Sequence, residues 1–142
     1  MAKVWNEFNS GDSFMVFVKG AVLEYNFLYN GTDGQSLCRN GSAPPVLMNL
    51  QATNVYTDDK TRLNKANKTQ ILGKTYWFKH ITIIHSESAT EGDKEVTEIF
   101  QGTVKYCSIN TMYCIMQVGN KYYETPISYI INSPKVTLKD RN

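Results

Sequence analysis

Apolar and polar residues alternate with a period of two along much of this 142-residue chain. The segment LEYNFLY at 23–29 is one example, with leucine or an aromatic residue at every second position. Successive side chains of a strand point to opposite faces, so this pattern indicates a strand. Gly20 is expected to mark a bulge or a break before it. The pairs Asn30-Gly31 and Asp33-Gly34 follow it and predict turns.

The second half of the chain repeats the alternation in longer segments. The clearest strand is predicted at 76–85, and KEVTEIF follows it after a polar loop. From Gly102 onward the pattern predicts a meander. Its strands TVKYCSI, MYCIMQV and KYYETPISYII are separated by the pairs Asn110-Thr111 and Gly119-Asn120, and KVTLK is a last short strand.

Two segments between these halves are ambiguous. Residues 46–56 alternate as a strand does, but a short helix with prolines in its first turn fits as well. The polar stretch 57–73 fits a long loop or a short exposed helix. No repeat and no domain boundary is visible. We therefore expect one all-β domain over residues 1–142, a small antiparallel barrel or sandwich of five to eight strands with a C-terminal meander.

Composition limits the class of protein. Hydrophobic residues make up 42% of the chain and charged residues 20%, which is typical of a globular domain. The net charge of +2 is too small to indicate nucleic-acid binding by itself, and no apolar run reaches the roughly 18 residues of a membrane helix. The start, MAKVWNEFNSGD, lacks the apolar segment of a secretory signal, which predicts a cytoplasmic protein. Abundant Asn, Lys, Ile and Tyr are typical of an AT-rich viral or bacterial genome, so a virion component is also considered.

The three cysteines, Cys38, Cys107 and Cys114, are too few for a secreted disulfide scaffold. A two-residue loop at Asn110-Thr111 would place Cys107 opposite Cys114, with their Cα atoms about 5.5 Å apart. That spacing allows a disulfide. However, side chains stand closer at the other kind of cross-strand position, and no secretory signal is present. We therefore predict two reduced, buried thiols that act as small hydrophobic groups.

Residue patterns for metal binding or catalysis are sparse. The two histidines, His80 and His85, are five residues apart on one predicted strand, so they point to opposite faces and cannot easily share a metal ion. Motifs of nucleophile elbows, phosphate-binding loops and dinucleotide-binding folds are absent. The acidic residues between 87 and 98 are interpreted as solvated surface. We expect no catalytic residues, no metal, no cofactor and a protein that is not an enzyme.

One basic segment suits an anionic ligand. Residues 60–79 are rich in lysine, and in KTYWFK two lysines flank three aromatic residues. Basic side chains beside aromatic rings suit the phosphates and bases of nucleotides or single-stranded nucleic acid. On a strand, alternate aromatic residues face opposite sides, so at least one of the three belongs to the core. The candidate ligand-binding residues are Arg62, Lys74, Tyr76, Trp77 and Lys79.

The meander suits a protein partner. Extending the hairpin registers places Lys105 opposite Met116 and gathers tyrosines on one face. Exposed tyrosines are common at interfaces, and the candidate interface residues are Tyr106, Tyr113 and Tyr122. The expected function is a non-enzymatic binding module, a structural or accessory subunit (viral in one interpretation) that acts through a protein partner or self-assembly and without a membrane. The alternative is a protein that binds or sequesters a nucleotide-like anion or single-stranded nucleic acid.

Overall fold

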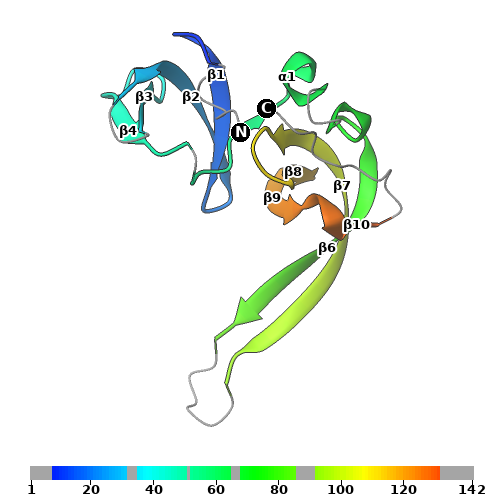
Figure 1. Ribbon diagram of the computed structural model, residues 1–142. Helices are drawn as coiled ribbons and strands as arrows, with labels where there is room; N and C mark the ends of the chain where they lie inside the picture. The colour runs from blue at the N-terminus through cyan, green and yellow to red at the C-terminus, as the bar shows by residue number, and fades with distance from the viewer. Residues whose placement is uncertain (1–7, 32–34, 51, 65–67, 86–91, 132–142) are drawn as a thin grey trace.

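The computed structural model describes residues 8–31, 35–50, 52–64, 68–85 and 92–131. Within these residues, ten strands form one sheet in which every pairing is antiparallel (Figure 1). Helix α1 (Lys60–Asn64) and the 3-10 helices η2 (Lys68–Gln70) and η3 (Ile127–Tyr129) lie between strands. The strands are β1 (Ser13–Val18), β2 (Ala21–Asn30), β3 (Ser36–Arg39), β4 (Val46–Met48), β5 (Tyr56–Thr57), β6 (Thr75–Ile84), β7 (Lys94–Ser108), β8 (Tyr113–Val118), β9 (Lys121–Pro126) and β10 (Ile130–Ile131).

The first hairpin joins β1 to β2 through the two-residue turn Lys19-Gly20. The φ angles are 48° for Lys19 and 84° for Gly20, and two positive φ angles are the mark of a type I′ turn. Val18 pairs with Ala21 directly across this turn. Gly20 therefore marks a break between two paired strands and not a bulge within one.

The two ambiguous segments contain both kinds of structure. Residues 46–56 include β4 and the start of β5, so the strand interpretation holds at both ends of that segment. The stretch 57–73 includes α1 and η2, so the short-helix interpretation holds there. β5 has only two residues, yet it pairs with β1 on one side and with β7 on the other. The first four strands and the second half of the chain meet at β5.

β6 and β7 form a long hairpin of ten consecutive residue pairs, and its outer half projects away from the rest of the molecule (Figure 1). β7 runs unbroken through Gly102, so KEVTEIF and TVKYCSI are one strand and not the two that the pattern predicted. A Cβ at this buried position would lie 2.9 Å from the Gln117 carbonyl oxygen and 3.1 Å from Phe78 Cε1. Glycine is therefore required here by close packing and not by a turn.

β7, β8 and β9 form the predicted meander. Cys107 faces Cys114 as predicted, although the connection between the two strands spans residues 109–112 and not two residues. The register shifts between Val104 and Tyr106, so Val104 is the residue that faces Met116. The predicted pairing of Lys105 with Met116 was wrong. A bulge at this point keeps Val104 in the core and leaves Lys105 exposed.

The turn between β8 and β9 is the predicted Gly119-Asn120 pair, with Val118 opposite Lys121. The φ angle of Gly119 is 61°, and Lys19 is the one described non-glycine residue with positive φ, so Asn120 completes a type II′ turn. Residues on the two strands pair in the predicted register out to Tyr113. The predicted strand KVTLK lies outside the described residues.

Two clusters of buried side chains fill the fold. The first lies mainly in the β1–β4 part, where the rings of Phe8 and Phe14 stack with their centroids 5.4 Å apart, and it also includes Ile109, which follows β7. The second lies where β6, β7 and β8 meet, and Phe78, Val104 and Met116 are fully buried in it. Each part of the sheet therefore has a core of its own.

The predicted all-β class is confirmed. The sheet is open and not a closed barrel, in the order β10-β6-β7-β5-β1-β2-β3-β4, with β8 and β9 branching from β7. Ten strands exceed the five to eight expected, and β5 and β10 have only two residues each, which is too few to show alternation. In the described part of the chain, no helix has the length and apolar character needed to cross a membrane.

Candidate functional site

The outer half of the β6–β7 hairpin, here called the arm, comprises residues 79–85 on the β6 side and 93–99 on the β7 side. Among the described residues, no third strand pairs with it. β10 reaches β6 only at the two residues before Lys79, and β8 reaches β7 only from Thr103 inward. Both edges of the arm therefore present backbone N–H and C=O groups that a further strand can use.

Apolar side chains lie on both faces of the arm. Ile81, Ile83 and Ile99 share one face, and Ile84 lies on the other with Val96. Ile83 is 56% exposed, Ile84 53% and Ile99 51%. A single exposed isoleucine is ordinary on a protein surface, but several on one uncovered hairpin indicate a contact surface.

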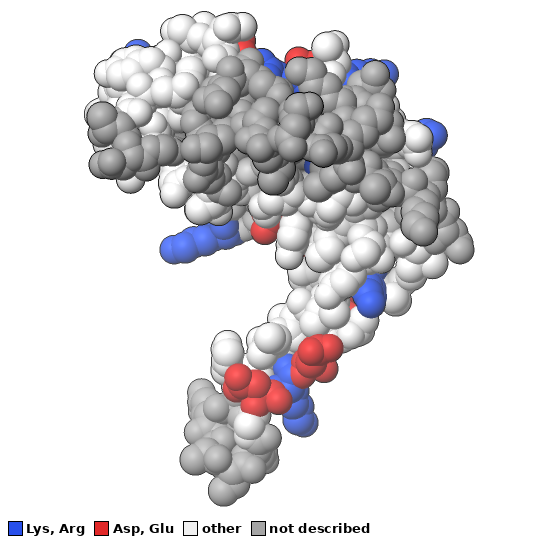
Figure 2. All heavy atoms as spheres, viewed as in Figure 1, with Lys and Arg blue, Asp and Glu red and all other residues white. Residues whose placement is uncertain are grey.

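Charged residues distinguish the two strands of the arm. The β7 side carries Lys94, Glu95 and Glu98, whereas residues 80–84 of β6 include no Lys, Arg, Asp or Glu. Figure 2 shows the acidic and basic side chains of this hairpin gathered on its outer part. Charged side chains therefore disfavour the pairing of a further strand with the β7 edge, whereas residues 80–84 of the β6 edge carry no such charges.

Aromatic packing anchors the arm at its base. The Phe100 ring stacks on Tyr123 with 5.1 Å between centroids, and the His80 ring meets Tyr123 edge to face at 4.8 Å. Phe78 packs beneath them at 6.0 Å from Phe100. Along β6 these ring contacts reach no further than His80, so among the described residues the aromatic packing holds the arm at its base.

The structure does not bring the five residues of the predicted ligand site together, and only Trp77 and Lys79 share one surface. Arg62, on α1, has Nη2 2.6 Å from Asp12 Oδ2 and Nε 3.8 Å from Asp59 Oδ2. Its guanidinium also lies 4.6 Å from the centroid of the Phe8 ring. Arg62 is thus held by carboxylates of the protein itself.

Trp77 and Lys79 lie together on one face of β6. Trp77 is 50% exposed, and Lys79 Nζ lies 4.5 Å from the centroid of the Tyr129 ring. Tyr76 points to the opposite face, where it packs against the second core, and Lys74 is exposed just before the strand. The basic-aromatic surface therefore contains Tyr129, which the sequence did not reveal because η3 returns to β6 from 50 residues away.

The three predicted interface tyrosines share one face of the meander by register. Tyr113 is 37% exposed, whereas Tyr106 and Tyr122 are half-buried. Ile115, which lies among them, is fully buried, and burial raises the pKa of Tyr106. These tyrosines do not form one continuous exposed patch.

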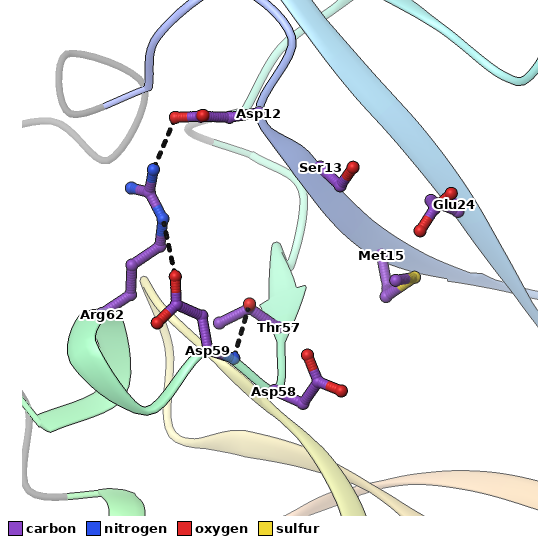
Figure 3. Close-up of a pocket in the computed structure, with 8 residues that line it drawn as sticks. All are labelled: Asp12, Ser13, Met15, Glu24, Thr57, Asp58, Asp59 and Arg62. Atoms are coloured by element: carbon purple, nitrogen blue, oxygen red, sulfur yellow. Dashed lines mark hydrogen bonds and ion pairs between the residues drawn. The ribbon is translucent and has the colours of Figure 1, made fainter.

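A cavity of about 270 Å³ lies where β1 and β2 approach β5 and α1 (Figure 3). Arg62 spans it between Asp12 and Asp59, and the Asp59 amide donates to the Thr57 hydroxyl at 3.0 Å. Among the described residues, no group of three or more His, Cys, Asp or Glu side chains is placed to hold a metal ion. The cavity is lined mainly by polar residues, and the ion pairs of Arg62 with Asp12 and Asp59 cross it. Its lining residues are Asp12, Ser13, Met15, Glu24, Thr57, Asp58, Asp59 and Arg62.

A fully buried lysine, which the sequence did not reveal, braces the inner end of β7. Lys68, on η2, donates hydrogen bonds from Nζ to the carbonyl oxygens of Ser108 and Thr111. Burial lowers the pKa of Lys68 to about 8. No signal marked this residue, because it stands in the polar stretch 57–73 among several other lysines.

Asn110 connects the same loop to the first half of the chain. Its Nδ2 donates to the carbonyl oxygens of Leu50 at 3.1 Å and Thr53 at 2.8 Å. Its Oδ1 accepts from the Val55 amide at 3.1 Å and from the Ser108 hydroxyl at 2.7 Å. One amide side chain therefore satisfies four polar groups, and three of them lie across the junction of the two parts.

All three cysteines are free and buried, in agreement with the prediction for Cys107 and Cys114. Burial raises the pKa of Cys107 to about 12 and that of Cys38 to about 11, and it raises the pKa of Cys114 as well. The thiolate is the reactive form of cysteine. These three thiols are therefore protonated and unreactive near neutral pH.

No family model, no curated protein and no solved structure matches this chain. Its function therefore has to be inferred from the geometry of its own residues.

Proposed function

We propose that this protein is a non-enzymatic interaction subunit and that the arm is its contact element. The observation that supports this proposal is the pairing pattern of β6 and β7, whose outer halves pair only with each other among the described residues. Three isoleucines on that hairpin are more than half exposed.

The physical argument concerns what keeps such a hairpin in place. A two-stranded hairpin without a covered face is marginally stable in water. The arm has no buried side chain beyond Phe78, so little apolar area is removed from water there. A partner that covers the isoleucines would supply this missing burial. A partner strand that pairs with the edge of the arm would do so by strand addition, which is a recurring mode of recognition.

A matched pair of variants tests the proposal. In Ile83→Lys the new charge faces Glu95 across the hairpin, which keeps the arm paired while it removes an exposed isoleucine. Leu47→Lys makes a comparable change on β4, at the other end of the sheet, where Leu47 is 59% exposed.

When the wild-type protein is immobilised, it should retain a partner protein, which can be a second copy of this chain. The Leu47→Lys variant should retain the same partner, and the Ile83→Lys variant should not. Light scattering after size exclusion should report any self-association as a mass above 16.2 kDa. Equal retention by wild type and Ile83→Lys would overturn the arm as the contact element.

A second candidate function is the binding of a nucleotide-like anion at Trp77 and Lys79. The half-exposed indole beside the Lys79 ammonium and the Tyr129 ring favours it, because bases stack on such rings and phosphates pair with such charges. Calorimetric titration with nucleotides and short oligonucleotides should show binding that weakens with salt. Loss of that binding in Trp77→Leu would assign it to this surface, and no heat at low salt would exclude it.

A further inference from the structure

The free edge of β6 identifies a partner for the arm, and this inference rests on the function proposed above. We propose that the partner is a second copy of this chain. The two copies pair antiparallel along residues 79–85 of β6, about a two-fold axis at Thr82. Their hairpins then form one four-stranded sheet in which the two β6 strands are central.

The β6 edge is the edge that lacks protection. Natural proteins guard exposed edges with charged side chains or proline. Residues 80–84 read HITII, with three isoleucines and no proline, Lys, Arg, Asp or Glu. Such β-branched residues favour strand pairing. The β7 edge carries Lys94, Glu95 and Glu98, so a further strand meets less resistance on the β6 side.

The limits of the free edge select the register. β10 pairs with the two residues before Lys79, so Lys79, whose ammonium contacts the Tyr129 ring of η3, is the first residue of this edge without a strand partner. The strand ends at Ile84, and His85 is the last residue described before the tip of the hairpin. The midpoint of this segment is Thr82. Antiparallel pairing centred there uses the whole free segment of both copies.

This register is self-complementary in its apolar side chains. Ile81 of one copy lies opposite Ile83 of the other, and the two-fold axis repeats the pair. Opposite residues of an antiparallel pair share a face, so these four isoleucines form one row with Ile99 on the same side. Cross-strand pairs of β-branched residues stabilise a sheet.

Charges on the arm change sign between its inner and outer ends. On the face of Ile83, the inner end carries Lys79, and the outer end carries Glu95 together with Asp93, whose Oδ2 lies 3.1 Å from His85 Nδ1. On the opposite face the order is reversed, with Glu98 at the inner end and Lys94 at the outer end.

Antiparallel pairing places the inner end of each copy beside the outer end of the other. Lys79 then lies opposite His85 of the second copy, whose Asp93 is one strand further on the same face. Glu98 lies in one cross-strand row with Lys94 of the second copy, with the two β6 strands between them. Both attractions act across intervening strands and not through direct contacts, and the axis repeats each of them. Parallel pairing would place like charges beside each other, so the charge pattern selects an antiparallel second copy.

A cysteine at the axis tests the register. Thr82 lies opposite itself in the pair, so Thr82→Cys should form a disulfide-linked dimer under a mild thiol oxidant, because the two Cα atoms would be about 4.5–5.5 Å apart. Thr97→Cys is the matched control, since Thr97 is equally an exposed threonine of the arm but lies on β7. The native cysteines are buried and do not compete.

Non-reducing electrophoresis should show the Thr82→Cys dimer at a protein concentration where Thr97→Cys stays a monomer. Equal cross-linking of the two variants, or none in either, would overturn the pairing about Thr82.

A charge exchange provides a second, independent measurement. Ile83→Lys should weaken self-association roughly tenfold or more, because the new charge faces Ile81 of the other copy. The double variant I81E/I83K should restore it, since the introduced carboxylate of each copy then faces the introduced ammonium of the other across the axis. Recovery measured by light scattering supports the register, and failure of the double variant to recover overturns it.

Failure of this inference is distinguishable from failure of the proposed function. A wild-type chain that stays monomeric, but retains another protein through the arm, overturns the second copy and keeps the arm as contact element. A dimer that Ile83→Lys leaves intact overturns both.

Discussion

The two ends of β7 share one strand and differ in what surrounds them. The outer end, residues 94–101, pairs with β6 alone, whereas the inner end, residues 102–108, also pairs with β8 and β5. No residue of the outer end is buried, whereas Gly102, Val104 and Cys107 of the inner end are. The strand is therefore paired along its whole length, with one bulge between Val104 and Tyr106, but burial is confined to half of it.

We infer from this difference that the inner end of β7 contributes mainly to the stability of the fold and the outer end mainly to association with a partner. Substitutions at the inner end remove buried contacts, so they should lower the free energy of unfolding. Substitutions at the outer end alter exposed groups, so they should change association and leave that free energy nearly constant. The following experiments test this separation, beginning with the largest expected effect.

Phe78→Ala should lower the free energy of unfolding by about 3–5 kcal/mol, because the fully buried ring beside β7 would leave a cavity. Ile84→Ala, on the same strand within the arm, should change it by less than about 0.5 kcal/mol. Urea denaturation of both variants measures the contrast. Similar losses in the two would mean that the arm is as well packed as its base and would break the comparison.

Gly102→Ala should cost about 2–3 kcal/mol, since the added methyl group meets the Gln117 carbonyl oxygen and the Phe78 ring at the boundary between the two ends. Gln101→Ala, one residue outward and exposed, is the control and should be nearly neutral. Thermal melts of the two variants locate the boundary. An unchanged melting temperature for Gly102→Ala would place the close packing elsewhere.

Gly119→Val should cost about 1–2 kcal/mol, because a β-branched residue would be forced to a φ of 61° in the turn that holds β8 and β9 against the inner end. Gly119→Ala should cost less, since alanine is forced to the same φ but has no branch at Cβ. Thermal melts should rank the parent, the alanine variant and the valine variant in that order. Identical melts for all three would contradict the type II′ turn.

Lys68 should make the inner end sensitive to pH. Its pKa is about 8 when folded and 10.5 ordinarily, so above pH 8 the folded chain binds fewer protons than the unfolded chain, and the free energy of unfolding rises with pH. Above about pH 9 the buried thiols oppose this rise, because the pKa of Cys107 is raised from 9.0 to about 12.

Between pH 8 and 9, Lys68 should therefore contribute a rise of about 1 kcal/mol that Lys68→Met lacks. Urea denaturation across this interval measures the difference between the two proteins. A parallel pH dependence in both would mean that Lys68 stays charged within the fold.

Much of the fold followed from local patterns. The turn at Gly119-Asn120 and the facing of Cys107 with Cys114 were predictable, because each depends on a few neighbouring residues. The bulge beside Lys105 was not, because no glycine marks it and its reason is the burial of Val104. The division of β7 into two predicted strands at Gly102 was wrong, because glycine alone cannot show whether a break in the strand or a close neighbour requires it.

The candidate site was harder to predict because it depends on partners distant in sequence. The pattern of 76–85 predicted the strand, but its exposure follows from where β8 and β10 stop. The sequence pattern predicted Arg62 as an anion-binding residue, but Arg62 forms an ion pair with Asp12, which lies 50 residues earlier in the chain. The burial of Lys68 could not be predicted for the same reason, since the carbonyl oxygens that accept its hydrogen bonds belong to the distant residues Ser108 and Thr111.

The narrowness of β5 has a consequence for how the molecule responds to mechanical load. β5 pairs with β1 at one position and with β7 at two, and Asn110 adds its bonds across the same junction. The second core lies on one side of this junction, whereas the first core also includes Ile109, which follows β7. Force applied between the β1–β4 part and the arm would therefore concentrate on these few hydrogen bonds, on the Arg62–Asp12 ion pair and on the packing of Ile109. The chain should extend in two steps, with the junction yielding first and each core resisting separately.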